Sequence, residues 1–179
     1  MRGFFGIGVE GIHKPQNVGS LVRSAHAFGA SFFFTVSPNT DIRGIQQTDT
    51  SGSFDHVPYY EYDSVETLDL PLGCRLVAVE LVEDAIELPI FRHPLKAAYI
   101  LGPEMGNVSP QMLEKCDFTI KIPMKFCINV GVAGALVMYD RLISLGKFAP
   151  RPVRAGGPTE ELKPGYHGFY RMNGGKKPG

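Results

Sequence analysis

The stretch that decides the fold runs from Ile122 to Tyr139 and reads I-P-M-K-F-C-I-N-V-G-V-A-G-A-L-V-M-Y. It begins as the end of a buried strand, turns tightly between Pro123 and Cys127, and enters a helix built almost entirely of small and apolar residues. Glycine and alanine let the main chain approach a ligand closely, so the free N–H and C=O groups of such a turn can surround a small molecule. We therefore expect a ligand site at this turn.

The composition is that of an ordinary folded domain. The chain has 179 residues, 44% of them hydrophobic and 20% charged, which favours one domain with a full core. Its net charge of zero argues against a protein covered in positive charge, although a local basic patch remains compatible. Three widely spaced cysteines form no disulfide framework or metal cluster, which suits a reducing cytoplasm. No apolar run is long enough to predict a membrane span.

Apolar runs and helical spacing predict an α/β fold with a mostly parallel sheet flanked by helices. The first 36 residues read as strand, loop, helix and strand, a crossover unit that joins parallel strands. Asn17 is the expected cap of the first helix, and Ser109 with Pro110 is the expected start of a later one. The strands are expected at residues 4–9, 31–36, 57–60, 75–80, 97–101 and 118–122, and the helices at 18–28, 42–48, 63–69, 111–116 and 129–147.

The last part of the chain differs in composition from the rest. Residues 1–150 are expected to form the folded domain, with a net charge of −4, whereas residues 151–179 form a basic tail with seven glycines, four prolines and a charge of +4. Such a tail is typical of a solvated terminus. The aromatic residues Tyr166, Phe169 and Tyr170 among its basic residues favour contact with the domain or with nucleic acid instead.

Asn17, Gly19 and Arg23 form the first group of candidate functional residues. A glycine at the start of a helix costs about 1 kcal/mol relative to alanine, which suggests that something must approach the backbone at Gly19. A helix N-terminus beside an arginine can bind a phosphate or a ribose oxygen. A capped helix carrying a solvated arginine is an equally good explanation of this stretch alone.

The second group is G-P-E-M-G, residues 102–106, directly after the strand expected at 97–101. Ligands of open parallel sheets bind beyond the carboxyl ends of the strands, where Glu104 would lie. Taken alone, an ordinary β-turn explains this segment better. No G-x-G-x-x-G fingerprint is present, which disfavours an ordinary nicotinamide or flavin enzyme. The five histidines share no spacing that predicts a metal site, and no nucleophile–histidine–acid pattern is evident.

Together these segments resemble the SPOUT superfamily of RNA methyltransferases, in its SpoU/TrmH-like branch. The family pattern N-x-G-x-x-x-R corresponds to Asn17, Gly19 and Arg23, and G-P-E-x-x-G to Gly102, Pro103, Glu104 and Gly106, with one residue fewer before the last glycine. The pattern I-P-M followed by S-L-N-V-S-x-A corresponds to residues 122–124 and 127–133. The resemblance covers about residues 4–146. Cys127 and Gly131 stand where the family usually has serine, and the loop before Cys127 is shorter than usual, which puts its contacts with substrate or donor in doubt.

The resemblance implies a deep trefoil knot in the C-terminal part of the fold and a homodimer in which Arg23 faces the donor bound in the other subunit. It implies S-adenosylmethionine as the methyl donor. By the same resemblance the catalytic residues are Arg23, Asn17 and Asn129. The residues expected to bind the donor are Val79, Leu101, Gly102, Glu104, Gly106, Ile122, Met124 and Ile128.

The implied reaction is methylation of a ribose 2′-hydroxyl in tRNA, or in rRNA, in the cytoplasm. Arg43, Arg92, Lys125 and the tail are candidate RNA contacts. Arginine is a poor base, with a pKa above about 12, so either Arg23 is neutral in a special pocket or it lowers the pKa of the hydroxyl electrostatically. Three alternatives remain: a non-catalytic RNA-binding member of the same fold, methylation of a base, and a nucleotide-binding enzyme on an ordinary doubly wound sheet.

Overall fold

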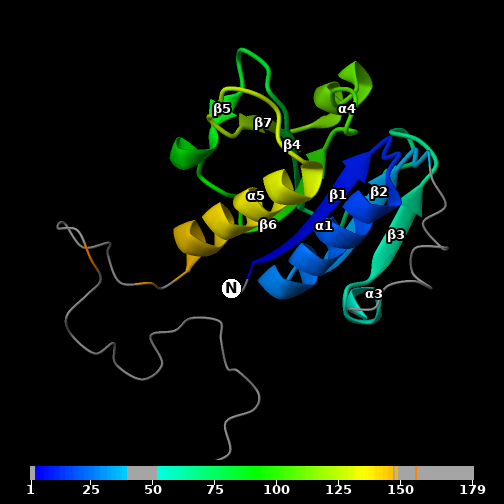
Figure 1. Cartoon of the computed structure of the whole chain (residues 1–179), viewed down its shortest axis with the longest axis horizontal. Helices are drawn as coiled ribbons and strands as arrows, with labels where there is room; N and C mark the ends of the chain where they lie inside the picture. The colour runs from blue at the N-terminus through cyan, green and yellow to red at the C-terminus, as the bar shows by residue number, and fades with distance from the viewer. Residues whose placement is uncertain (1–2, 40–51, 147, 149–155, 157–179) are drawn as a thin grey trace, which may run out of the picture.

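The computed structural model describes residues 3–39 and 52–146, together with residues 148 and 156. The helix expected at 42–48, Arg43 and the basic tail therefore lie outside the described residues, apart from Gly156. Figure 1 shows the arrangement of the elements. They are, in order, β1 (Phe4–Glu10), α1 (Pro15–Phe28), β2 (Phe32–Val36), α3 (Ser53–His56), β3 (Tyr59–Tyr62), β4 (Arg75–Val79), β5 (Ile86–Glu87), the 3₁₀ helix η1 (Leu88–Ile90), β6 (Lys96–Leu101), α4 (Pro110–Lys115), β7 (Phe118–Lys121) and α5 (Val130–Leu145).

The strands form one seven-stranded sheet in the order β3-β2-β1-β6-β4-β7-β5, and every pair of neighbours is parallel. This confirms the expected α/β architecture with a mostly parallel sheet. The central strands are buried on both faces, which is why they read as continuous apolar runs. All carboxyl ends of the strands meet at one edge of the sheet, and that edge is where the expected site residues were placed.

Two hydrophobic clusters lie on opposite faces of the sheet, because successive side chains of a strand alternate between faces. Phe33 and Tyr99 belong to the cluster that includes buried residues of α1 and α5. Phe32, Phe34 and Ile100 belong to the cluster that includes buried Met112 of α4. The helices α1 and α5 therefore lie side by side over one face, as Figure 1 shows.

Three local expectations differ from the structure. Helix α1 begins at Pro15 with Lys14 as its N-cap, so Asn17 lies inside the first turn and is not the cap. Residues 63–69 form turns and no helix, because the Thr67 hydroxyl donates to the Ser64 carbonyl at 2.9 Å and accepts from the Ser64 N–H at 3.1 Å. These local bonds compete with helical ones. The strand expected at 57–60 lies two residues later, and α3 and β5 were not expected.

Arg141 fixes the far half of α5 to the amino-terminal edge of the sheet. Its side chain is buried, and it donates to the Pro94 carbonyl at 2.5 Å, to the Leu95 carbonyl at 2.8 Å and to the Phe4 carbonyl at 3.4 Å. It also donates to the Tyr99 hydroxyl at 3.2 Å. No local pattern predicts that this arginine is buried, because the carbonyl groups that it binds lie far away along the chain.

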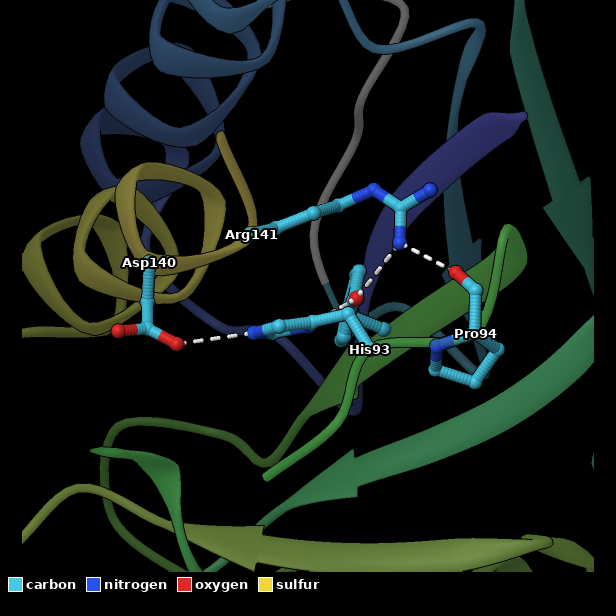
Figure 2. A network of polar contacts seen from close by, with 5 residues as sticks. His93, Pro94, Asp140 and Arg141 are labelled. Atoms are coloured by element: carbon cyan, nitrogen blue, oxygen red, sulfur yellow. Dashed lines mark hydrogen bonds and ion pairs between the residues drawn. The ribbon is translucent and has the colours of Figure 1, made fainter. Parts of the chain in front are cut away.

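His93 completes this buried network (Figure 2). Its Nδ1 lies 2.6 Å from the Tyr99 hydroxyl, and its Nε2 lies 2.9 Å from Asp140 Oδ2. Because Arg141 already donates to the hydroxyl, we assign Tyr99 as donor to Nδ1 and Nε2–H as donor to Asp140. Desolvation lowers the pKa of His93, against the opposing effect of Asp140, and burial raises the pKa of Tyr99 to about 12.

Candidate functional site

A pocket lies at the carboxyl ends of β4, β6 and β7, beside the start of α5. All eight residues expected to bind the donor line this pocket, although they come from segments spread over fifty positions of the chain. The lining residues are Val79, Glu80, Leu81, Leu101, Gly102, Pro103, Glu104, Gly106, Ile122, Met124, Cys127, Ile128, Val130 and Ala133. Aliphatic side chains dominate this list, so the pocket offers an apolar wall with a few polar groups, the usual character of a small-molecule site.

Gly102 closes one side of the pocket. A Cβ at this position would lie 2.7 Å from the backbone nitrogen of Val108, a distance that real side chains do not show. The loop after β6 therefore folds back tightly on Gly102, and the backbone at the strand end stays accessible from the pocket. A larger residue at position 102 would displace residues 107–108 and reshape this side of the site.

Glu104 joins this loop to the start of α1. Its Oε1 accepts from Asn17 Nδ2 at 2.6 Å and from the Lys14 N–H at 3.3 Å, and its Oε2 accepts from the His13 N–H at 3.3 Å. Desolvation alone would raise the pKa of Glu104, but these hydrogen bonds outweigh it and hold the pKa below the usual value. The carboxylate thus stays ionised and supports the N-terminus of α1, which has no side-chain cap of its own.

Asn129 extends the same network to α5. Its Nδ2 donates to Asn17 Oδ1 at 2.8 Å, and its Oδ1 accepts from the Gly131 N–H at 2.9 Å, which caps α5. Asn17 is buried between Glu104 and Asn129 and bonds to both. The three motif segments are therefore held together by one chain of side-chain hydrogen bonds, Glu104–Asn17–Asn129, although Asn17 had been expected only at a helix cap or a catalytic position.

Two further glutamates at strand ends were missed by sequence reasoning. Glu80, after β4, accepts from the Val108 N–H at 2.7 Å. Glu10, at the end of β1, accepts from the Ser109 N–H at 2.8 Å and from its hydroxyl at 2.6 Å. The Ser109 hydroxyl in turn accepts from the Met112 N–H, which confirms the predicted cap of α4. The available signal was their position, since each of these acids ends or follows a strand, as Glu104 does.

Arg23 does not lie in the pocket. Its side chain is exposed on α1 and makes no hydrogen bond or ion pair with the part of the chain that the structure describes. Gly19, one turn earlier, faces open space, because a Cβ there would meet no atom within 4 Å. Nothing within the described chain therefore requires a glycine at position 19 or a cation at position 23, and both are free to meet another molecule.

The described residues contain no group of three histidine, cysteine or acidic side chains arranged to hold a metal ion. Cys127 is exposed and lines the pocket, whereas burial raises the pKa of Cys74 to about 11 and that of Cys116 to about 12. None of the helices within the described ranges combines the length and the apolar character needed to cross a membrane.

The sequence model of the SpoU rRNA Methylase family matches residues 5–139, about three quarters of the chain. The chain belongs to this family. The matched region spans β1 to α5 and includes every residue of the Glu104–Asn17–Asn129 chain. The resemblance to the SpoU/TrmH-like branch is thus confirmed at the level of the family.

Among curated SpoU relatives, a Staphylococcus aureus (strain COL) protein assigned by name to the TrmH family of tRNA/rRNA methyltransferases is 29% identical over 140 residues. The tRNA (guanosine(18)-2′-O)-methyltransferase of Escherichia coli (strain K12) is 26% identical over 138 residues. Each alignment covers 74% of this chain, but only 56% and 60% of the respective relatives. The chain therefore spans a little more than half the length of these proteins.

Solved structures share the SpoU fold of the chain. An AdoMet-bound rRNA methyltransferase from Sinorhizobium meliloti superposes with a TM-score of 0.72 at 18% identity, covering 81% of this chain and 58% of that one. A structure described as concerning the 2-OH methylation of C/U34 on tRNA has a TM-score of 0.67 at 23% identity and covers 80% of this chain and 91% of that one. At these identities the likeness establishes the fold.

Proposed function

We propose that this protein is an S-adenosylmethionine-dependent methyltransferase that acts in the cytoplasm on a ribose 2′-hydroxyl of tRNA or rRNA. The observation that carries the proposal is that the second and third motif segments line one pocket, to which the Glu104–Asn17–Asn129 chain joins the first segment. Membership of the SpoU family supports it. The name of the Escherichia coli relative, a tRNA 2′-O-methyltransferase, supports the choice of a ribose hydroxyl.

The residues of the pocket fit the proposed donor. Val79, Leu101, Ile122 and Ile128 provide an apolar wall suited to an adenine ring, and the backbone at Gly102 is open to close approach. Ionised Glu104 at the pocket adds negative charge, which favours a ligand that carries a sulfonium cation. S-adenosylmethionine supplies an activated methyl group, so the protein has to align that group with the attacking oxygen and assist loss of the hydroxyl proton.

Arg23 is the residue we assign to the hydroxyl. It is exposed and unpaired within the described chain, so its guanidinium is free to stabilise the oxygen as negative charge develops on it. Asn17 is bonded both to Asn129 and to Glu104, so we assign the two asparagines the task of orienting the backbone around the reacting groups. This account needs no neutral arginine, because a phosphate or water can take the proton.

We also propose that the protein acts as a homodimer with α5 at the interface. Val132, Leu136 and Tyr139 are 52%, 40% and 49% exposed, and their spacing places them on one stripe of α5. Such a stripe, beside the pocket-lining residues Val130 and Ala133, suits contact with a second copy. In this arrangement Arg23 of one subunit would serve the pocket of the other, which accounts for its position outside its own pocket.

Mixed dimers test this arrangement. Arg23→Ala and Gly102→Val should each be inactive as pure dimers, the first without the catalytic cation and the second with a distorted pocket. Unfolding and remixing the two variants should restore about a quarter of the wild-type rate, because half of the dimers are mixed and each has one complete site. No recovery, with mixed dimers demonstrated by differential tagging, would place Arg23 at the pocket of its own subunit.

We further propose that the C-terminal part of the domain is knotted. The strand order supports this proposal, because β4 lies between β6 and β7, although both follow it in the chain. The loop residues after β7 and the start of α5 line the same pocket as the loop after β6. A knot would hold these loops against each other and keep the pocket in shape without a covalent link.

The decisive experiment combines the protein with isotope-labelled S-adenosylmethionine and either total tRNA or rRNA, followed by digestion and identification of the labelled nucleoside. We expect a 2′-O-methylated nucleoside from one pool. A labelled base would overturn the ribose assignment and keep the methyltransferase. Donor binding without transfer would favour a non-catalytic RNA-binding protein, and absence of donor binding in calorimetry would overturn the whole proposal.

A further inference from the structure

Two large apolar side chains stand exposed on the two loops that border the pocket. Phe126 is 76% exposed and lies between Met124 and Cys127, both of which line the pocket. Met105 is 87% exposed and lies between Glu104 and Gly106, which line it as well. Met124, Cys127, Glu104 and Gly106 line the pocket, whereas Phe126 and Met105 stand beside it in contact with solvent.

This exposure is costly and has no explanation within the described chain. A phenylalanine left in water forgoes roughly 2 kcal/mol of burial free energy. Single exposed apolar side chains are common on protein surfaces, but Phe126 stands beside an apolar pocket, where a bound ligand would cover it. The ring lies beside residues that line the pocket, where a substrate that enters the pocket would meet it.

The charges around the rim favour a polyanion with aromatic groups. Lys125, next to Phe126, is exposed and makes no ion pair with the residues that the structure describes. The nearby carboxylates of Glu80 and Glu104 are already bound to backbone N–H groups and, for Glu104, to Asn17. The rim therefore presents one unpaired cation beside one exposed ring, the combination with which proteins hold unpaired nucleotides.

We propose that Phe126 stacks on the nucleobase of the nucleotide whose ribose enters the pocket, with Lys125 on a neighbouring phosphate and Met105 against the opposite side of the base. The proposal rests on the proposed function for the identity of the reaction, but it assigns a specificity contact of its own. It requires the target nucleotide to be unpaired, because a base inside a duplex cannot reach a ring at the rim of the pocket.

The absence of tryptophan from the chain gives a direct test. Phe126→Trp places a single indole at the rim, and Leu72→Trp places one at a residue that is 96% exposed before β4, near the opposite edge of the sheet. Both variants are titrated with unmodified total tRNA and with rRNA from cells lacking the protein. We expect a saturable loss of emission for Trp at position 126 and none at position 72.

Three results would overturn the proposal. One is equal quenching of the two variants, and another is no quenching of the Phe126→Trp protein by either RNA. The third is a blue-shifted emission from position 126 that depends on protein concentration without RNA, which would show that a second copy of the chain covers the ring. Calorimetric titration with S-adenosylmethionine runs in parallel, so that failure of donor binding, which bears on the proposed function, is read separately.

Kinetics sharpen the assignment. Phe126→Ala should raise the KM for RNA roughly tenfold, as loss of one base stack does, while leaving donor affinity unchanged. Phe126→Tyr keeps the ring and should stay near the wild-type KM, whereas Phe126→Leu keeps apolar bulk and should behave like alanine. If Leu restores the wild-type KM, the contact is simple apolar burial and stacking is excluded. Leu72→Ala is the matched control.

Discussion

Helix α5 is attached to the sheet by a polar network at each end, and the two networks differ in access. At its start, exposed Asn129 bonds to Asn17 and through it to Glu104, beside an open pocket. Near its end, Arg141 is only 5% exposed and His93 only 4%. Both networks bridge distant parts of the chain, but only the first borders a surface that a ligand can reach.

The difference separates two uses of a polar network, one open to solvent and one buried. The Arg141 network is satisfied by protein groups alone, so it can fix the position of α5 but cannot respond to a substrate. The Glu104–Asn17–Asn129 chain positions backbone that lines the pocket, so a substitution in this chain should change the affinity of the pocket for a ligand. We therefore expect the first to control stability and the second to control ligand handling.

The largest effect should come from a residue that belongs to neither network. Arg23→Ala should lower the rate of methyl transfer roughly 100-fold to 10,000-fold, because it removes the group that assists proton loss. Its exposed position predicts an unchanged thermal midpoint and unchanged donor affinity. Single-turnover transfer, calorimetry and thermal melting measure the three quantities. Near-wild-type transfer would remove Arg23 from the mechanism.

Arg141→Leu tests the closed network. It leaves the carbonyls of Pro94 and Leu95 and the Tyr99 hydroxyl without their donor, so the free energy of unfolding should fall by about 3 kcal/mol. Urea denaturation measures the loss, and Arg92→Leu, at an exposed position, is the control. Weakened donor binding by the folded Arg141→Leu protein would show that the two ends of α5 are coupled, contrary to the comparison.

Glu104→Gln tests the open network with a smaller change in shape. Loss of the charge weakens the bonds from His13, Lys14 and Asn17, and we expect a fall of about 1 kcal/mol in stability together with weaker donor binding. Glu114→Gln on the exposed side of α4 is the matched control. In a double-mutant cycle with Asn17→Ala, the losses of unfolding free energy should be less than additive. Additive losses would show that the hydrogen bonds act as independent contacts and not as a network.

The smallest expected effect is on the pH dependence of stability, which should differ between the two networks. His93 has a lowered pKa when folded, so the unfolded chain binds the proton first, and stability should fall as the pH drops below about 6.5. The pKa of Glu104 is lowered as well, and its contribution should persist until the pH falls below about 4.5, the usual value for a glutamate. Urea midpoints measured across this range should show two steps, and His93→Gln should remove only the upper one.

Much of the fold was predictable because the central strands are buried on both faces. The runs F-F-G-I-G-V and A-A-Y-I-L have no other good explanation, and the strand–helix–strand unit fixed parallel pairing. The order of the strands was not predictable, because the pairing of β1 with β6 joins residues about ninety positions apart. Residues 63–69 misled because Ser64 and Thr67 favour helix starts and turns equally.

The pocket was predictable only because three motifs were considered together. Each motif alone had an ordinary explanation, and Asn17 in particular read as a helix cap. Its true partners, Glu104 and Asn129, lie 87 and 112 positions away, beyond any local pattern. The burial of Arg141 was not predictable for the same reason. A helical arginine is usually a surface residue, and the carbonyl groups that bind this one lie far away along the chain.

The position of β6 between β1 and β4 has a consequence for synthesis. One edge of β1 stays unpaired until residue 101 has left the ribosome. The pocket is incomplete until α5 follows, because the start of α5 supplies part of its lining. A nascent chain therefore exposes apolar strand edges for most of its translation, and such late long-range closure slows folding. A chain truncated before α5 should therefore aggregate or be degraded.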